Sequence, residues 1–162
     1  MDEQAPGRLV RVPATGPLRA AVLRLAPRPE HEQFSGRASQ TLPLAERDPL
    51  RHPYVHVEGA LPVGFLVLDE ATGPVDPTAD LLLRGLFVDA AAQRRGVAGR
   101  MVAALPGTLA ADLQAARSVV LTVNVRNDVA RRLYLRGGFV DTGELHLGGS
   151  AGPQHVLRLD LR

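Results

Sequence analysis

The sequence contains no cysteine, lysine, isoleucine or tryptophan, and aromatic residues make up only 4% of it. Without cysteine, a disulfide framework, a thiolate nucleophile and a zinc ribbon are all excluded. No apolar run approaches the length needed to cross a bilayer, and the N-terminal residues MDEQAPGRLV lack the pattern of a signal peptide. The five histidines show no HExxH or paired metal-ligand spacing. We therefore expect a cytoplasmic protein with no membrane partner and no metal.

Apart from histidine, every basic side chain is an arginine, and the net charge at pH 7 is only +2. Acidic residues and arginines are interspersed along the chain. A nucleic-acid partner would require clustered positive charge, so we expect none. The 162 residues, 45% of them hydrophobic, suit one globular domain. We therefore predict a single domain over residues 1–162.

The apolar pattern predicts a mixed α/β chain with antiparallel strand pairs at both ends. Strands are predicted at residues 9–12, 54–58, 63–69, 81–88, 118–125, 139–147 and 155–161, and helices at residues 17–25, 30–38 and 127–136. Another helix starts near residue 97, and we expect Pro106 and Gly107 to kink or split it. Arg84 and Gly85 interrupt an apolar strand and predict a bulge. Residues 36–53 carry only a weak pattern.

One segment has the form of an anion site. The strand ending near residue 88 runs into a loop with small residues at Gly96, Ala98 and Gly99, and a helix follows. Such a turn directs free main-chain N–H groups and the positive end of the helix at one point. Arg94 and Arg95 add charge beside it. The segment predicts a phosphate or pyrophosphate site, although a glycine turn between strand and helix is also common as plain structure.

Two other kinds of phosphate site do not fit the sequence. A P-loop needs a Gly-Lys-Ser/Thr sequence, and the chain has no lysine. A dinucleotide fold needs an acidic residue at the end of the next strand, and that strand ends Thr122-Val-Asn-Val-Arg126.

A second segment holds both asparagines of the chain, Asn124 and Asn127, and one of its two tyrosines, Tyr134. Asn127 or Asp128 can serve as a helix N-cap, which alone would explain an asparagine at this position. Tyr134 can equally be a half-buried packing residue with its hydroxyl in water.

Taken together, the two segments resemble the signature blocks of the GCN5-related N-acetyltransferase (GNAT) superfamily. The block Gln/Arg-x-x-Gly-x-Gly/Ala is matched by Gln93-Arg-Arg-Gly-Val-Ala98. The block of Asn, Ala-x-x-Leu-Tyr and Gly-Phe is matched by Asn127, Ala130-Arg-Arg-Leu-Tyr134 and Gly138-Phe139. The order of the blocks and the intervening strand agree as well, and the resemblance extends over residues 81–139.

The resemblance implies an α/β (α+β) fold with a central mixed, mostly antiparallel sheet, splayed middle strands and flanking helices. It implies acetyl-coenzyme A as co-substrate and direct transfer of the acetyl group to a primary amine, without a covalent enzyme intermediate. Tyr134 would be the catalytic acid that protonates the departing thiolate. The residues that the resemblance assigns to the coenzyme are Leu86, Phe87, Val88, Gln93, Arg94, Arg95, Gly96, Val97, Ala98, Gly99 and Asn127.

The general base is not assigned. Many members of the superfamily carry a glutamate on a central strand, where this chain has Arg84 and Thr122. A water chain ending on Glu32 or Glu58 is one candidate.

The acceptor also stays open. The run Glu30-His-Glu-Gln-Phe34, with Val63-Gly-Phe65 and Leu83-Arg-Gly-Leu-Phe-Val-Asp89, is similar to bacterial spermine/spermidine acetyltransferases and suggests a polyamine or another small amine. Glu30 and Glu32 can also lie on a solvated helix face. The alternatives are an acetyl-coenzyme A-binding sensor module without turnover and an acetyltransferase for protein N-termini or side chains. The superfamily also suggests a homodimer.

Overall fold

The structure is a computed structural model that describes residues 7–161. Residues 1–6, which include part of the segment compared with a signal peptide, and residue 162 lie outside the described residues. The fold is built on one seven-stranded sheet with the order β1-β2-β3-β4-β5-β7-β6. Its strands are β1 (Arg8–Arg11), β2 (Arg51–Glu58), β3 (Leu61–Asp69), β4 (Leu81–Val88), β5 (Ser118–Asn124), β6 (Val140–His146) and β7 (Gln154–Asp160).

All neighbouring strands pair antiparallel except β4 and β5, which are parallel. The predicted antiparallel pairs toward the two ends of the chain, β2 with β3 and β6 with β7, are confirmed. The mixed, mostly antiparallel sheet expected from the resemblance is confirmed too.

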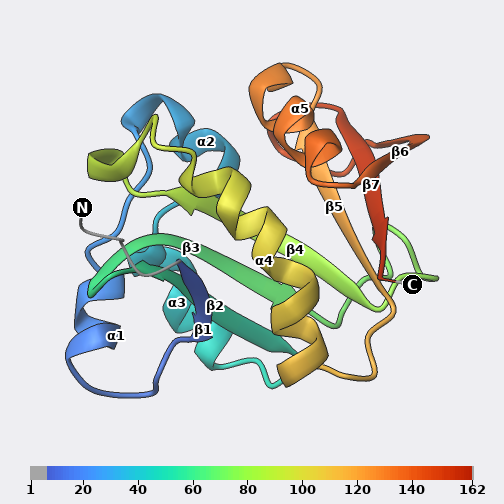
Figure 1. Ribbon diagram of the computed structural model, residues 1–162. Coiled ribbons are helices and arrows are strands. Elements are labelled where there is room, and N and C mark those ends of the chain that lie inside the picture. Colours follow the sequence, from blue (N-terminus) through green and yellow to red (C-terminus); the bar gives the residue numbers. More distant parts are fainter. Residues whose placement is uncertain (1–6, 162) are drawn as a thin grey trace.

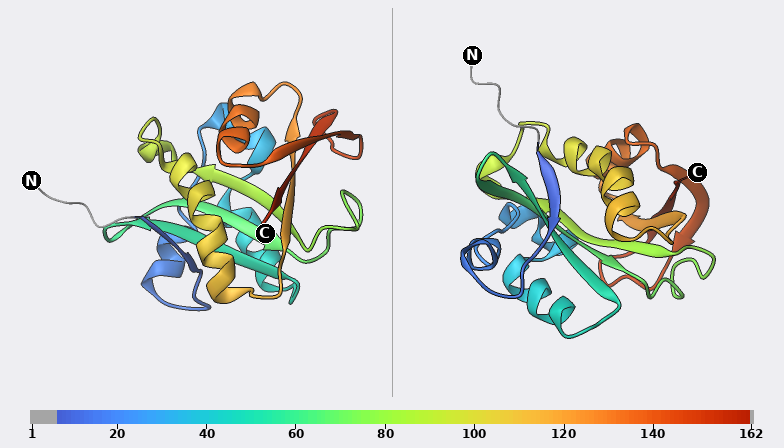
Figure 2. Two further views of the ribbon diagram at one scale, coloured as in Figure 1. Left: turned by 45° about the vertical axis from the view of Figure 1, so that its right-hand side comes forward. Right: turned by 60° about the horizontal axis from the view of Figure 1, so that its bottom comes forward.

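Helices cover both faces of the sheet (Figures 1 and 2). They are α1 (Pro17–Val22), η1 (Pro29–His31), α2 (Glu32–Ser35), α3 (Ala38–Glu46), η2 (Ala90–Ala92), α4 (Val97–Asp112) and α5 (Asp128–Arg136). The larger core lies between the sheet and α4 with α5, and the smaller core lies under α1 and α3. No helix within residues 7–161 combines the length and apolar character that crossing a bilayer requires.

Of the two effects expected from Pro106 and Gly107, the split of the helix is wrong, and a kink stays a prediction. Pro106 lies inside α4, which continues unbroken to Asp112. The proline is on the exposed side, whereas Met101, Leu105 and Leu109 are fully buried on the other. A proline costs a helix about 3 kcal/mol, and each large buried side chain contributes about 1.5–3 kcal/mol. Burial of the apolar face therefore outweighs the lost hydrogen bond.

The predictions for residues 30–53 also need correction. The expected helix over residues 30–38 is replaced by η1 and the short α2, which ends at Gly36 with φ +74°. The sequence pattern missed α3, which contains Pro43. Its buried residues, Ala38, Leu42 and Ala45, recur at helical spacing, but the prolines obscured that signal.

The predicted bulge in β4 is confirmed. Phe87 pairs with Phe65 and Arg84 pairs with Val67, so two residues of β4 stand opposite one residue of β3. Gly85 takes φ +60° at this point, a conformation that strains other residues. The bulge bends the half of β4 that leads to the candidate site.

Candidate active site

The sheet opens between its two parallel strands. β4 and β5 pair only at Leu81 with Val119 and Leu82 with Val120. Both strands continue beyond these pairs, to Val88 and Asn124, and they diverge as they do so (Figure 1). The main chain of β4 over residues 83–88 therefore has no strand partner on its β5 side, which is the splay that the resemblance implied.

The loop after β4 brings unpaired N–H groups to the open end. Asp89 accepts a hydrogen bond from the N–H of Ala91 and caps η2. Arg94 and Gly96 then adopt positive φ, +64° and +73°, and Gly96 is the N-cap of α4. Within residues 7–161, no acceptor pairs with the main-chain N–H of any residue from 94 to 99. These donors and the positive end of a 16-residue helix form a site suited to an anion.

The side chains of this loop divide into two kinds. The amide of Gln93 donates to the carbonyl oxygen of Val88 at 2.7 Å, which ties the loop to the end of β4. Arg94 and Arg95 are exposed, and neither forms an ion pair with a carboxylate of the described residues. Gln93 therefore holds the loop against the end of β4. The charges of Arg94 and Arg95 are not neutralised by a carboxylate of the described residues and are available to a ligand.

Tyr134 projects from α5, the helix that follows β5. The residue is only 8% exposed, and its ring packs edge-on against Phe139 with the centroids 5.7 Å apart. Its hydroxyl has no hydrogen-bond partner among residues 7–161, yet it is not one of the fully enclosed polar atoms. The oxygen therefore keeps some accessible surface although the ring is buried. Burial raises the pKa of Tyr134 well above its ordinary value, so the phenol keeps its proton at neutral pH.

Close packing of α5 on α4 fixes where Tyr134 lies. A Cβ on Gly137, at the C-terminal end of α5, would clash with Cγ1 of Val102 on α4. Glycine is therefore required here by the close approach of the two helices. The helix that carries the tyrosine and the helix that begins at the anion site are held as one unit.

The two asparagines have structural partners. Asn127 is the N-cap of α5, and its side-chain oxygen accepts from the N–H of Ala130 at 3.3 Å. Asn124 is buried at the end of β5, where its amide donates to the carbonyl of Ala151 at 2.8 Å. The capping interpretation of Asn127 is thus confirmed. Its side-chain nitrogen makes no hydrogen bond within the described residues and can still donate to a ligand.

Both carboxylates suggested as the end of a water chain form ion pairs, and the two strand positions carry no base. Arg84 on β4 pairs with the buried Asp69 at 2.8 Å. Glu32 pairs with Arg37 at 2.7 Å. Hydrogen bonding from Arg100 lowers the pKa of Glu58 to about 2, which makes this carboxylate a poor proton acceptor. Thr122, the remaining position, has no basic group.

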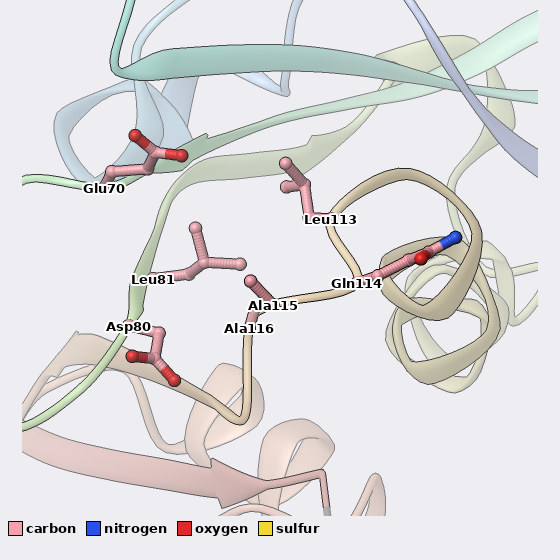
Figure 3. Close-up of a pocket in the computed structure, with 7 residues that line it drawn as sticks. All are labelled: Glu70, Asp80, Leu81, Leu113, Gln114, Ala115 and Ala116. Atoms are coloured by element: carbon pink, nitrogen blue, oxygen red, sulfur yellow. The ribbon is translucent and has the colours of Figure 1, made fainter.

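A separate pocket lies at the closed end of the two parallel strands (Figure 3). Its lining residues are Glu70, Asp80, Leu81, Leu113, Gln114, Ala115 and Ala116. Leu81 pairs with β5, so this pocket stands at the opposite end of β4 from the loop at Gly96. It is not the anion site. Among residues 7–161, no group of three or more histidine, aspartate or glutamate side chains is arranged to hold a metal ion.

One charged group beside the anion site was not predicted from the sequence. Arg100, in the first turn of α4, forms a two-point ion pair with Glu58 at the end of β2. The two residues are 42 positions apart, and only the fold brings them together. No local spacing pattern could have revealed this pair.

Comparison with known proteins agrees with this arrangement. Residues 19–139 match the sequence profile described as the acetyltransferase (GNAT) family. The uncharacterized N-acetyltransferase YbbJ of Bacillus subtilis (strain 168) is 29% identical over 133 residues, which cover 79% of this chain and 82% of YbbJ.

Solved structures share the fold. AAC(6')-Ib, in complex with paromomycin and acetyl-coenzyme A, superposes with a TM-score of 0.74 and 19% identity over 96% of this chain and 94% of its own. Spermidine N-acetyltransferase from Vibrio cholerae, in complex with coenzyme A and spermine, superposes with a TM-score of 0.67 and 18% identity over 94% and 93%. With three quarters of its residues inside the family profile and this shared fold, the chain is an N-acetyltransferase of the acetyltransferase (GNAT) family.

Proposed function

We propose that the protein transfers the acetyl group of acetyl-coenzyme A to the primary amine of a small molecule. The observation that carries the proposal is the opening between β4 and β5, with the unpaired N–H groups of residues 94–99 in the loop that follows β4. Tyr134 lies on α5, the helix that follows β5. Structural neighbours bind acetyl-coenzyme A or coenzyme A in the same fold.

The residues of the chain fit the coenzyme in two stretches. The N–H groups of residues 94–99 would hold the pyrophosphate, helped by Arg94 and Arg95 and by the dipole of α4. Leu86, Phe87 and Val88 lie where β4 has no strand partner on its β5 side, and this edge would accept the pantetheine arm in the way that a sheet edge accepts an added strand. Asn127 would donate from its free side-chain nitrogen.

Bound acetyl-coenzyme A supplies an acetyl group activated as a thioester. A main-chain N–H near Val88 would polarise the thioester carbonyl as the amine nitrogen forms its bond to the acetyl carbon. Tyr134 holds its phenolic proton at neutral pH and would give it to the sulfur as the carbon–sulfur bond breaks. The amine nitrogen loses its proton to solvent as the amide forms, and solvent returns a proton to the phenol.

The acceptor would arrive as a free amine. Arg84, on the central strand, is committed to Asp69, and the low pKa of Glu58 removes it as a base. An alkylamine has a pKa of about 10, so only a small fraction is neutral at pH 7.

We include a polyamine among the candidate acceptors because Glu30 and Glu32 lie in η1 and α2, and α2 packs against β4. A cationic acceptor would replace their present partners, Arg28 and Arg37. The spermidine acetyltransferase neighbour binds spermine.

The missing strand carboxylate also favours a second candidate, a module that binds acetyl-coenzyme A without turnover. Release of free thiol from acetyl-coenzyme A separates the two. The protein would be assayed with spermidine, an aminoglycoside, a simple alkylamine and a peptide with a free N-terminus, each against a control without amine. Thiol release with at least one small amine supports the enzyme. Stabilisation by acetyl-coenzyme A with no thiol release from any acceptor supports the module.

A further inference from the structure

Arg100 stands in the first turn of α4 with its guanidinium held at two points. Its Nε donates to one carboxylate oxygen of Glu58 at 2.6 Å and its Nη2 donates to the other at 2.9 Å. The third nitrogen, Nη1, makes no hydrogen bond within residues 7–161. A Cβ placed on Gly96 would lie 3.1 Å from this nitrogen. The free end of the guanidinium therefore lies beside the N-cap of the proposed pyrophosphate site.

Glu58 is itself held in place. Its carboxylate lies 3.1 Å from Nε2 of His56, which is fully buried on β2. The hydrogen bond from Arg100 is the largest cause of the lowered pKa of Glu58, and the contact with His56 lowers it further. The carboxylate is thus ionised at any neutral pH. Arg100 has a fixed, charged partner that determines where its guanidinium points.

Orientation distinguishes Arg100 from the other arginines at the site. Arg94 and Arg95 are exposed and must lose side-chain freedom when they bind an anion. Arg100 has already lost that freedom to Glu58. A guanidinium presents five N–H donors in a planar fork, so two contacts to a carboxylate leave others for a phosphate oxygen.

We propose that Arg100 is a further phosphate-binding residue of the coenzyme site, which donates from Nη1 to the pyrophosphate while Glu58 holds its guanidinium. The inference rests on the proposed function. The competing interpretation is that the ion pair only ties α4 to β2. The two interpretations differ in what the arginine contributes: affinity for a phosphate group in the first, and stability of the unliganded protein in the second.

Binding measurements on Arg100→Gln separate them. Calorimetry would give the dissociation constants of acetyl-coenzyme A and of S-acetylpantetheine, which has the same thioester and arm but no phosphate. The matched control is Arg47→Gln, because Arg47 is exposed and makes no side-chain hydrogen bond or ion pair within the described residues. Arg100→Gln should weaken acetyl-coenzyme A binding by about tenfold, the lower range for a hydrogen bond to a charged group. Affinity for S-acetylpantetheine should be unchanged, and Arg47→Gln should alter neither.

Arg100→Lys serves as the second variant, and as the test itself if Arg100→Gln does not fold. Lysine keeps the positive charge but lacks the planar guanidinium of arginine. The variant should therefore bind acetyl-coenzyme A about threefold more weakly than wild type. Equal affinity of wild type and both variants for acetyl-coenzyme A, with only their melting temperatures lowered, overturns the inference. If the wild type itself does not bind acetyl-coenzyme A, the proposed function fails, and the two failures are thereby distinguished.

Discussion

The two tyrosines of the chain are both buried, but their hydroxyl groups meet different surroundings. Tyr54 on β2 is fully buried, donates to Asp112 at 3.0 Å and lies under the guanidinium of Arg11. Tyr134 on α5 is almost as buried, but its hydroxyl has no partner within the described residues. The hydroxyl of Tyr54 has its hydrogen-bond partner within the described residues. The hydroxyl of Tyr134 has none there and is available to a ligand.

This difference indicates a structural role for Tyr54 and supports the catalytic role proposed for Tyr134. A buried hydroxyl without a partner loses a hydrogen bond to water, so folded proteins rarely keep one without reason. Tyr54 avoids that loss through Asp112, and its pKa rises to about 12, first through burial and then through the same hydrogen bond. The pKa of Tyr134 rises through burial alone. Removing the same oxygen from each tyrosine should therefore have opposite consequences.

The largest effect is expected from Tyr134→Phe. The variant keeps the ring that packs on Phe139 but has no proton to give to the sulfur. Turnover should fall by about tenfold or more, while affinity for acetyl-coenzyme A and the melting temperature stay close to wild type. Steady-state thiol release and calorimetry on the same preparation measure both. Unchanged turnover would remove Tyr134 from the mechanism.

Tyr54→Phe should reverse this pattern. Loss of its hydrogen bond to the partly exposed Asp112 should lower the free energy of unfolding by about 1 kcal/mol, because the carboxylate can recover water as a partner. Turnover should not change. Urea unfolding at pH 7 provides the measurement, and a turnover loss as large as that of Tyr134→Phe would mean that the proposed division between the two tyrosines is wrong.

The smallest effect is expected at alkaline pH. Both phenols have raised pKa values in the folded state, so above pH 10 the unfolded chain loses phenolic protons that the folded chain keeps. Stability is therefore fully present below about pH 10 and declines as the pH rises further. At pH 10.5 each tyrosine should account for about 0.8 kcal/mol of this decline. Urea unfolding at pH 8 and 10.5 should show a smaller decline in either Phe variant than in wild type, and equal declines would contradict the assignment.

Local features of the fold could be read from the sequence. Gly85 marked the bulge and Asn127 the helix cap, because each lies where a short-range rule applies. The turn at Gly96 was recognisable for the same reason. Pro106 and Pro43 were misleading, since their local cost is outweighed by burial on the far side of α4 and α3.

The ion-pair partners of the arginines could not be predicted from the sequence. Arg84 with Asp69 and Arg100 with Glu58 depend on strand register and helix placement, which no spacing rule specifies. The environment of Tyr134 depends likewise on the packing of α5 against α4 through Gly137. The sequence could indicate that Tyr134 lies in this helix. Only the fold shows that its hydroxyl has no hydrogen-bond partner within residues 7–161.

The central claim is that the main-chain N–H groups of residues 94–99 bind the pyrophosphate of the coenzyme. Amide hydrogen exchange tests this claim most directly. With acetyl-coenzyme A added, exchange should slow in the peptide containing residues 94–99 and in the end of β4, while the loop over residues 71–79, which follows the other end of β3, serves as an unaffected reference. If calorimetry shows binding and exchange over residues 94–99 does not slow, the coenzyme binds elsewhere and the account is contradicted.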